Sequence, residues 1–280
     1  MYRIAQKKTL NPTVTQMDIE APYVAAKAQA GQFIILRVHK NGERIPLTIA
    51  GYDRTAGTVR IIFQVVGATT MLLNAKNEGE YIEDFVGPLG NATDLGGVKK
   101  ALVVGGGVGS AIALPIAQAL KKNGCAVTSV VGFRNKDLVI LKEDFQEASE
   151  RFILMTDDGS AGRKGLVTEP LREILEKEKD IDKIFIIGPL VMMKFAVECA
   201  RPFGVPTVVS MNPIMIDGTG MCGCCRLTVG GKMLFACVDG PDFDGHEVDF
   251  DEAMKRGSMY KEFEAHAREA TCNLLQKEVK

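Results

Sequence analysis

The sequence predicts a β + α/β protein, with an antiparallel β-barrel domain, a parallel-sheet α/β domain and a small cysteine-rich module. Short segments rich in β-branched residues fill the first hundred positions, and strand-like and helix-like segments alternate after them. Four of the seven cysteines lie between positions 222 and 237. A chain of 280 residues, 46% of them hydrophobic, can bury more than one core. We therefore divide the chain into residues 1–97, 98–210 and 211–248, with a helical tail at 249–280.

The first domain is predicted from three strand-like segments, Gln32–Val38, Gly57–Val66 and Glu80–Val86. β-Branched and aromatic residues favour strands, and the glycine, asparagine and proline residues around each segment are typical of turns. Several short strands in succession indicate an antiparallel barrel or sandwich. We expect residues 1–97 to form such a barrel.

The second domain is predicted from apolar runs that alternate with helix-like segments such as Leu166–Lys179 and Val191–Ala200. The runs are Ala101–Val104, Ala126–Val131, Phe152–Met155, Ile184–Ile187 and Thr207–Val209. Strands that alternate with helices predict a parallel sheet covered on both faces.

The stretch Ala101–Leu120 carries no charge and is long enough to cross a bilayer. It contains four glycines within positions 105–109, and glycine makes a poor helix centre but a good turn between strand and helix. We interpret the stretch as a buried strand, a turn and a helix, and not as a membrane span. The N-terminus lacks the apolar core of a signal peptide, so we expect a cytoplasmic protein.

Composition narrows the function classes. A formal net charge of −1 argues against nucleic acid as the main partner, because such binders usually carry a basic excess. The clustered cysteines favour metal binding in a reducing compartment over a disulfide framework.

Candidate metal ligands are Asp217, Cys222, Cys225 and Cys237, separated by four, two and eleven residues. A tight loop with three ligands and a later fourth one is typical of plant-type two-iron clusters, which normally have cysteine in all four places. A carboxylate oxygen is a harder donor than a thiolate and would alter the cluster potential. The spacing therefore predicts an iron-sulfur site with one unusual ligand.

Two alternatives remain at the cysteine-rich segment. A structural zinc site also uses Cys-x-x-Cys, and Cys224, Cys237 or His246 could complete its tetrahedron. The cysteines could also bind no metal. We assign Cys224 no role.

The glycine turn is the second chemical signal, and it comprises Gly105, Gly106, Gly107, Val108 and Gly109. Backbone N–H groups at a helix start favour a pyrophosphate, although such turns also occur for packing and this one is not G-x-G-x-x-G. Loops at 132–135, 156–160 and 188–190 follow later strands and would line the same crevice, because ligands bind at the carboxyl ends of parallel strands. We predict a Rossmann-like nucleotide-binding domain.

The third signal lies in the barrel region, where Arg44-Ile-Pro-Leu-Thr48 follows a turn and Gly67-Ala-Thr-Thr70 precedes the helix-like segment Met71–Ala75. An arginine and a threonine near a proline could hold one phosphate, and threonines at a helix start another. The alternative is a surface arginine and an ordinary helix N-cap.

In this order, together with Gly-Pro-Leu-Gly at 87–90, the motifs resemble the ferredoxin-NADP reductase superfamily over nearly the whole chain. The chain is most similar to the branch with the electron-transfer subunit of dihydroorotate dehydrogenase, the sulfide dehydrogenase small subunit and the small subunit of NADH-dependent reduced ferredoxin:NADP oxidoreductase. Asp217 departs from the four cysteines of the dihydroorotate dehydrogenase subunit and resembles the last of these, in which an aspartate and three cysteines hold the cluster.

The resemblance implies FAD in the barrel and NAD(H) on the glycine turn. The residues it implies for FAD are Arg44, Pro46, Leu47, Thr48, Gln64, Thr69 and Thr70. Those for NAD(H) are Gly105, Gly106, Gly107, Val108, Gly109, Arg134, Asp157 and Gly188. It implies a 2Fe-2S cluster on Asp217, Cys222, Cys225 and Cys237.

The same resemblance implies an oxidoreductase subunit without a catalytic acid or base. Nicotinamide exchanges hydride and the cluster single electrons, so the flavin is needed between them. The implied partner is a larger flavin and iron-sulfur subunit, which contacts ferredoxin in a complex that bifurcates electrons. An iron-sulfur carrier or sensor without nicotinamide chemistry is the alternative from another class.

Overall fold

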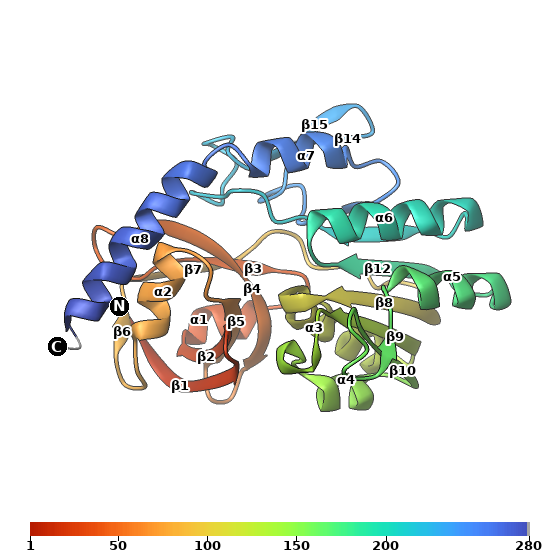
Figure 1. Ribbon diagram of the computed structural model, residues 1–280, viewed down its shortest axis with the longest axis horizontal. Coiled ribbons are helices and arrows are strands. Elements are labelled where there is room, and N and C mark those ends of the chain that lie inside the picture. Colours follow the sequence, from red (N-terminus) through yellow and green to blue (C-terminus); the bar gives the residue numbers. More distant parts are fainter. Residues whose placement is uncertain (279–280) are drawn as a thin grey trace.

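The computed structural model describes residues 1–278 and contains two seven-stranded sheets and a two-stranded hairpin (Figure 1). The first sheet is antiparallel in the order β6-β1-β2-β5-β4-β3-β7. Its strands are β1 (Tyr2–Asn11), β2 (Val14–Glu20), β3 (Phe33–Arg37), β4 (Arg44–Asp53), β5 (Thr58–Gln64), β6 (Tyr81–Ile82) and β7 (Asp84–Leu89). Helices α1 (Pro22–Lys27) and α2 (Ala68–Ala75) lie in its connections. This is the predicted antiparallel domain, although β1, β2 and β4 escaped the strand prediction.

Strand β3 is apolar on both faces. Ile34 and Leu36 point into the barrel core, whereas Phe33 and Ile35 belong to a second core shared with the C-terminal half of the chain. Successive side chains of a strand point to opposite faces, so β3 serves both cores at once. The outer face of the barrel at β3 is therefore covered by other parts of the chain and not by water.

The second sheet has the order β11-β10-β9-β8-β12-β13-β16. Its strands are β8 (Lys100–Gly106), β9 (Ala126–Phe133), β10 (Arg151–Thr156), β11 (Arg163–Lys164), β12 (Lys183–Ile187), β13 (Thr207–Ser210) and β16 (Asp242–Asp244). The strand order reverses between β8 and β12, which places the ligand crevice of an open α/β sheet at their carboxyl ends. Strand β16 comes from the cysteine-rich segment and pairs antiparallel with β13, so the predicted parallel sheet is mixed at this edge.

Helices cover both faces of this sheet. Ala101 and Val103 of β8 pack with α3 (Ser110–Lys122) and α4 (Lys142–Ala148), whereas Leu102 and Val104 pack with α5 (Thr168–Lys177) and α6 (Leu190–Ala200). This double burial explains why the strand is an apolar run without alternation. Short 3₁₀ turns η1 (Gly107–Gly109), η2 (Lys136–Leu138) and η3 (Arg201–Phe203) complete the domain. The uncharged stretch thus forms β8, η1 and α3 as predicted.

The cysteine-rich segment contributes the hairpin β14 (Arg226–Val229) and β15 (Lys232–Phe235), neither of which was predicted. The tail forms α7 (Phe250–Gly257) and α8 (Lys261–Glu278). Helix α7 packs near α6 and β14, and α8 crosses to the barrel, where it lies against α2 (Figure 1). Among residues 1–278, no helix combines the length and the apolar character that a membrane crossing requires.

Candidate functional site

The side chain of Asp217 is held by backbone N–H groups of the loop that precedes β14. Its Oδ1 accepts a hydrogen bond from the Thr219 N–H at 2.8 Å, and its Oδ2 accepts one from the Cys222 N–H at 2.7 Å. The Thr219 N–H in particular, and that of Cys222 after it, lower the pKa of the Asp217 carboxyl. Asp217 is therefore kept ionised and oriented, and each oxygen still has lone pairs for a further bond.

Cys225 and Cys237 form a buried thiol pair with Sγ atoms 3.2 Å apart. A disulfide requires about 2.05 Å, and two sulfurs bound to one tetrahedral metal at about 2.3 Å lie roughly 3.7 Å apart. Burial, and after it the neighbouring Cys225, raise the pKa of the Cys237 thiol to about 12. A metal that binds this pair must therefore displace a thiol proton.

Cys222 differs from the buried pair because its side chain is exposed. A backbone N–H at Cys224 is the main cause that lowers the pKa of the Cys222 thiol. The four predicted ligands thus fall into two pairs, Asp217 with Cys222 and Cys225 with Cys237. A two-iron cluster takes two protein ligands on each iron, so this donor set suits it.

A single metal ion, as in the zinc alternative, would need several such side chains around one point. Within residues 1–278, no three His, Cys, Asp or Glu side chains are placed to bind one metal ion. His246, a ligand in the zinc alternative, has its Nε2 3.1 Å from the Val205 carbonyl oxygen instead. Cys224 keeps its thiol partly buried, and its carbonyl oxygen accepts a hydrogen bond from Arg256 of α7.

The predicted FAD residues from Arg44 to Thr48 lie on β4. The Nε of Arg44 is buried and has no hydrogen-bond partner among residues 1–278, whereas Arg37, opposite Arg44 in the ladder, binds Asp84 at 2.7 Å. An unpaired buried guanidinium N–H is costly, and a phosphate oxygen would satisfy it. Leu47 is partly buried and packs against the barrel core.

The remaining barrel residues surround the start of α2. Gln64 is exposed at the end of β5. The Thr69 hydroxyl donates to Glu43 Oε2 at 2.9 Å, and the Thr70 hydroxyl accepts from the N–H groups of Val66 and Gly67. Thr70 thus accepts from the backbone of Gly67, the N-cap residue of α2, and its predicted contact with FAD stays a prediction.

The glycine turn follows β8 and begins α3. A Cβ at Gly109 would lie 2.7 Å from Gly188 Cα, and one at Gly106 would overlap Met192 Sδ at 2.1 Å. Packing thus explains these glycines. Gly107 differs, because it has φ +54° and open space where a Cβ would stand. It offers the bare backbone that a pyrophosphate can approach.

Arg134 and Asp157 lie at the carboxyl ends of β9 and β10, and both are exposed. They share the sheet edge with the glycine turn and Gly188, as predicted. Two residues at this edge were missed: Ser110, whose Oγ is buried without a partner, and Met192, which lies over Gly106. Ser110 directly follows the glycine turn, which is a usable signal, whereas the position of Met192 depends on how α6 packs.

The loop with the predicted metal ligands, called the cluster loop below, and the predicted FAD residues of β4 share one face of the barrel. Phe33 lies opposite Thr48, and Ile35 opposite Pro46, and directly opposed residues of antiparallel strands project to the same side. A Cβ at Gly218, next to Asp217, would lie 2.8 Å from Ile35 Cδ1. The loop with the metal ligands therefore packs on the strand adjacent to Pro46 and Thr48, about 5 Å away across the sheet.

Comparison with known proteins gives a consistent result. Residues 212–249 match the iron-sulfur cluster binding domain of dihydroorotate dehydrogenase B. The chain is 49% identical over 264 residues to the dihydroorotate dehydrogenase B (NAD(+)) electron transfer subunit homolog of Thermotoga maritima, with 94% of this chain and 93% of that one covered. It is 31% identical over 258 residues to the electron transfer subunit of Enterococcus faecalis, with 89% and 97% covered.

Solved structures agree. A chain of the NADH-dependent reduced ferredoxin-NADP oxidoreductase, a structure described for flavin-based electron bifurcation, superposes with a TM-score of 0.92 at 45% identity and covers 96% of this chain and 97% of its own. The ferredoxin reductase of carbazole 1,9a-dioxygenase, at 18% identity and a TM-score of 0.62 over 73% of this chain and 65% of its own, shares the fold. The predicted ferredoxin reductase-like architecture is confirmed, and the family match supports iron-sulfur over zinc.

Proposed function

Because the chain belongs to the family of dihydroorotate dehydrogenase B (NAD(+)) electron transfer subunits and their homologues, we propose that it passes electrons between NAD(H) and a larger catalytic subunit through FAD and a 2Fe-2S cluster. The chain is an electron-transfer subunit of an oxidoreductase. Nicotinamide supplies hydride chemistry, the cluster single-electron chemistry, and the flavin both.

The observation that supports this proposal best is the common barrel face. Pro46 and Thr48 lie one strand away from Ile35, on which the cluster loop packs. The side chains implied for FAD and the loop implied for the cluster therefore border the same face of the barrel, at the buried residues Phe33 and Ile35. Such proximity serves direct electron exchange without a mobile carrier.

The chain's own residues would bind and orient the groups. Arg44 would pair with the FAD pyrophosphate, and Thr48 and Gln64 would contact the flavin from two strands. Gly107 would admit the NAD(H) pyrophosphate at the start of α3, with Arg134, Asp157 and Gly188 beside it. No side chain needs to act as acid or base, because positioning suffices for these transfers.

Asp217 supports a closer assignment within the family. The dihydroorotate dehydrogenase subunits that the chain resembles have cysteine at this position. In this chain, two backbone N–H groups orient the Asp217 carboxylate as an oxygen donor. We therefore propose the NADH-dependent reduced ferredoxin-NADP oxidoreductase type, in which ferredoxin would be contacted through the larger subunit. The dihydroorotate dehydrogenase and sulfide dehydrogenase types remain the alternatives.

The larger subunit would bind where the cluster loop reaches the surface. Cys222 is exposed there, Met221 is 89% exposed, and Met233 of the hairpin is 62% exposed. Exposed apolar side chains beside a redox centre suit a protein partner. Among the described residues, Cys125, Cys199 and the four cysteines at 222–237 form no disulfide, and we propose a reducing compartment, the cytoplasm.

The test is a visible spectrum of anaerobically prepared protein before and after NADH addition, with analysis of iron, acid-labile sulfide and zinc. We expect flavin and iron-sulfur absorption, and bleaching of the flavin band by NADH. Bleaching by dithionite alone would favour the iron-sulfur carrier. Stoichiometric zinc without iron would overturn the proposal.

A further inference from the structure

The linker between the two large domains, residues 90–99, is bound to the barrel at two points. The Gln32 side-chain amide donates to the Gly90 carbonyl oxygen at 2.9 Å, and the Thr93 N–H donates to the Ala30 carbonyl oxygen at 3.0 Å. Both barrel residues precede β3, the strand on which the cluster loop packs. The linker thus has a fixed position relative to that face.

The same linker is bound to the cysteine-rich segment just after the ligand Cys237. The Asn91 N–H donates to the Gly240 carbonyl oxygen at 2.7 Å, and its side-chain amide donates to the Val238 carbonyl oxygen at 3.1 Å. A Cβ at Gly90 would lie 2.9 Å from Pro241 Cδ, so the two backbones touch. The barrel, the linker and the cysteine-rich segment therefore meet along one line of contact, called the seam below.

An acid lies in the seam without a countercharge. Asp242, the first residue of β16, accepts a hydrogen bond from the Thr93 hydroxyl at 2.6 Å, and its Oδ1 is buried without a partner. Burial raises the pKa of Asp242, and the hydroxyls of Thr93 and Ser210 offset part of that rise. The neighbouring acid of the linker, Asp94, is paired instead with Lys183 of β12.

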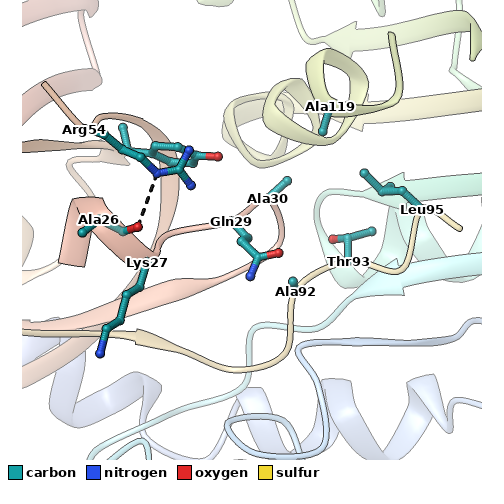
Figure 2. A pocket seen from close by; sticks show the side chains of 10 residues that line it. Ala26, Lys27, Gln29, Ala30, Arg54, Ala92, Thr93, Leu95 and Ala119 are labelled. Carbon is teal, nitrogen blue, oxygen red and sulfur yellow. Dashed lines mark hydrogen bonds between the residues drawn. The ribbon is translucent and has the colours of Figure 1, made fainter. Parts of the chain in front are cut away.

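Thr93 packs against Gly31 of the barrel. Gly31 has φ +86°, and a Cβ there would lie 2.0 Å from Thr93 Oγ1. Figure 2 shows Thr93 and Ala92 facing Ala30 and Gln29 around a cavity of ≈ 530 Å³. Thr93 lines this cavity and binds the carboxyl of Asp242, which is half-buried, so Thr93 lies between the cavity and that carboxyl.

We propose that Thr93 and Asp242 form a latch, in which Asp242 is a positioning residue that fixes the cluster loop against the flavin face of the barrel. The inference rests on the proposed function, because the latch sets the separation over which electrons pass. It assigns a role to a buried acid that neither cofactor binding nor metal ligation uses. Displacement of about 1 Å between reacting centres can lower a rate roughly a hundredfold.

The experiment compares Thr93→Val, Gly31→Ala and Asp242→Asn in the full chain loaded with both cofactors. Stopped-flow absorption separates flavin reduction by NADH from the later reduction of the cluster. We expect Thr93→Val and Gly31→Ala to slow the second step about tenfold or more and to leave the first unchanged. Asp242→Asn keeps an oxygen for the Thr93 hydroxyl and should retain a rate close to that of the unmodified chain.

Amide hydrogen exchange gives a readout that does not depend on turnover. In Thr93→Val, the N–H groups of Asn91 and Thr93 should lose protection, whereas those of β9 should keep it. The control is Ser149→Ala, which removes a buried hydroxyl pair of 2.7 Å with Ser129, away from the seam. Unchanged transfer and unchanged exchange in Thr93→Val would overturn the latch, and missing flavin or cluster absorption in the unmodified chain would instead overturn the proposed function.

Discussion

The barrel and the cysteine-rich segment position their candidate ligands by different means. The barrel encloses its own core, with fully buried residues such as Ile34, Leu36 and Phe85, and a strand presents Arg44 and Thr48. The cysteine-rich segment has a two-stranded hairpin and lends β16 to the neighbouring sheet, so its buried residues join a core built mostly by other elements. Strand β4 thus places its candidate ligands through the barrel's own core, whereas the cysteine-rich segment places its candidate ligands through packing on its neighbours.

The largest difference should appear when the ligands are removed. We expect Cys225→Ser to abolish the iron-sulfur absorption and the electron paramagnetic resonance signal of the reduced protein, because a buried thiolate ligand is lost. FAD should remain bound, since the barrel core does not depend on the cluster. Hydrogen exchange should rise in 212–249 and stay unchanged in the barrel.

Cys224→Ser is the matched control, one residue away from the ligand. It should keep the cluster, because Cys224 is not one of the four predicted ligands and its N–H, which lowers the pKa of Cys222, is unchanged by the substitution. A cluster that survives Cys225→Ser and is lost in Cys224→Ser would show that the ligands are wrongly assigned.

The same contrast explains what could be predicted from the sequence. Apolar runs such as Ala101–Val104 identify strands because both faces are buried, and the ligand spacing identifies the metal loop because coordination demands it. Strand β1 was missed, since its exposed edge carries Lys7 and Lys8 and resembles a loop. The pairing of β16 with β13 and the position of Met192 depend on tertiary packing, which no local pattern records.

On the barrel side, Arg44→Ala should weaken FAD binding roughly ten- to a hundredfold, because a charge-assisted contact to phosphate contributes about 1.5–3 kcal/mol. Fluorescence quenching of FAD on titration with the apoprotein measures this change. Arg37→Ala is the control, since Arg37 lies opposite Arg44 but is already paired with Asp84. Equal losses in both variants would mean that Arg44 acts only through barrel stability.

In the cysteine-rich segment, Met221→Asp should weaken binding of the larger subunit about tenfold, as the loss of one central apolar contact does. Affinity is measured by interferometry with the subunit isolated from the native complex. Tyr23→Asp on α1 changes a side chain of the same exposure, 89%, and should leave the affinity unchanged. Identical affinities for the two variants would place the partner on another surface.

The smallest effect concerns the seam that joins the two regions. The pKa of Asp242 is raised in the folded protein, chiefly by burial, so the folded state holds this proton more tightly than the unfolded chain. Its contribution to stability is therefore present below the unfolded pKa of about 3.9 and is lost as pH rises to the folded pKa, by about 1.4 kcal/mol per pH unit in that window. Asp242→Asn has no such proton. The gap between its free energy of unfolding and that of the unmodified chain should therefore change in favour of Asp242→Asn as pH rises. Urea unfolding at several pH values measures the gap.

Asp94→Asn should change the pH dependence with the opposite sign, because the Gly96 N–H and Lys183 lower the pKa of Asp94. A gap for Asp242→Asn that does not widen with pH would mean that this carboxyl ionises in the folded protein as readily as in the unfolded chain, and that the seam is open to water.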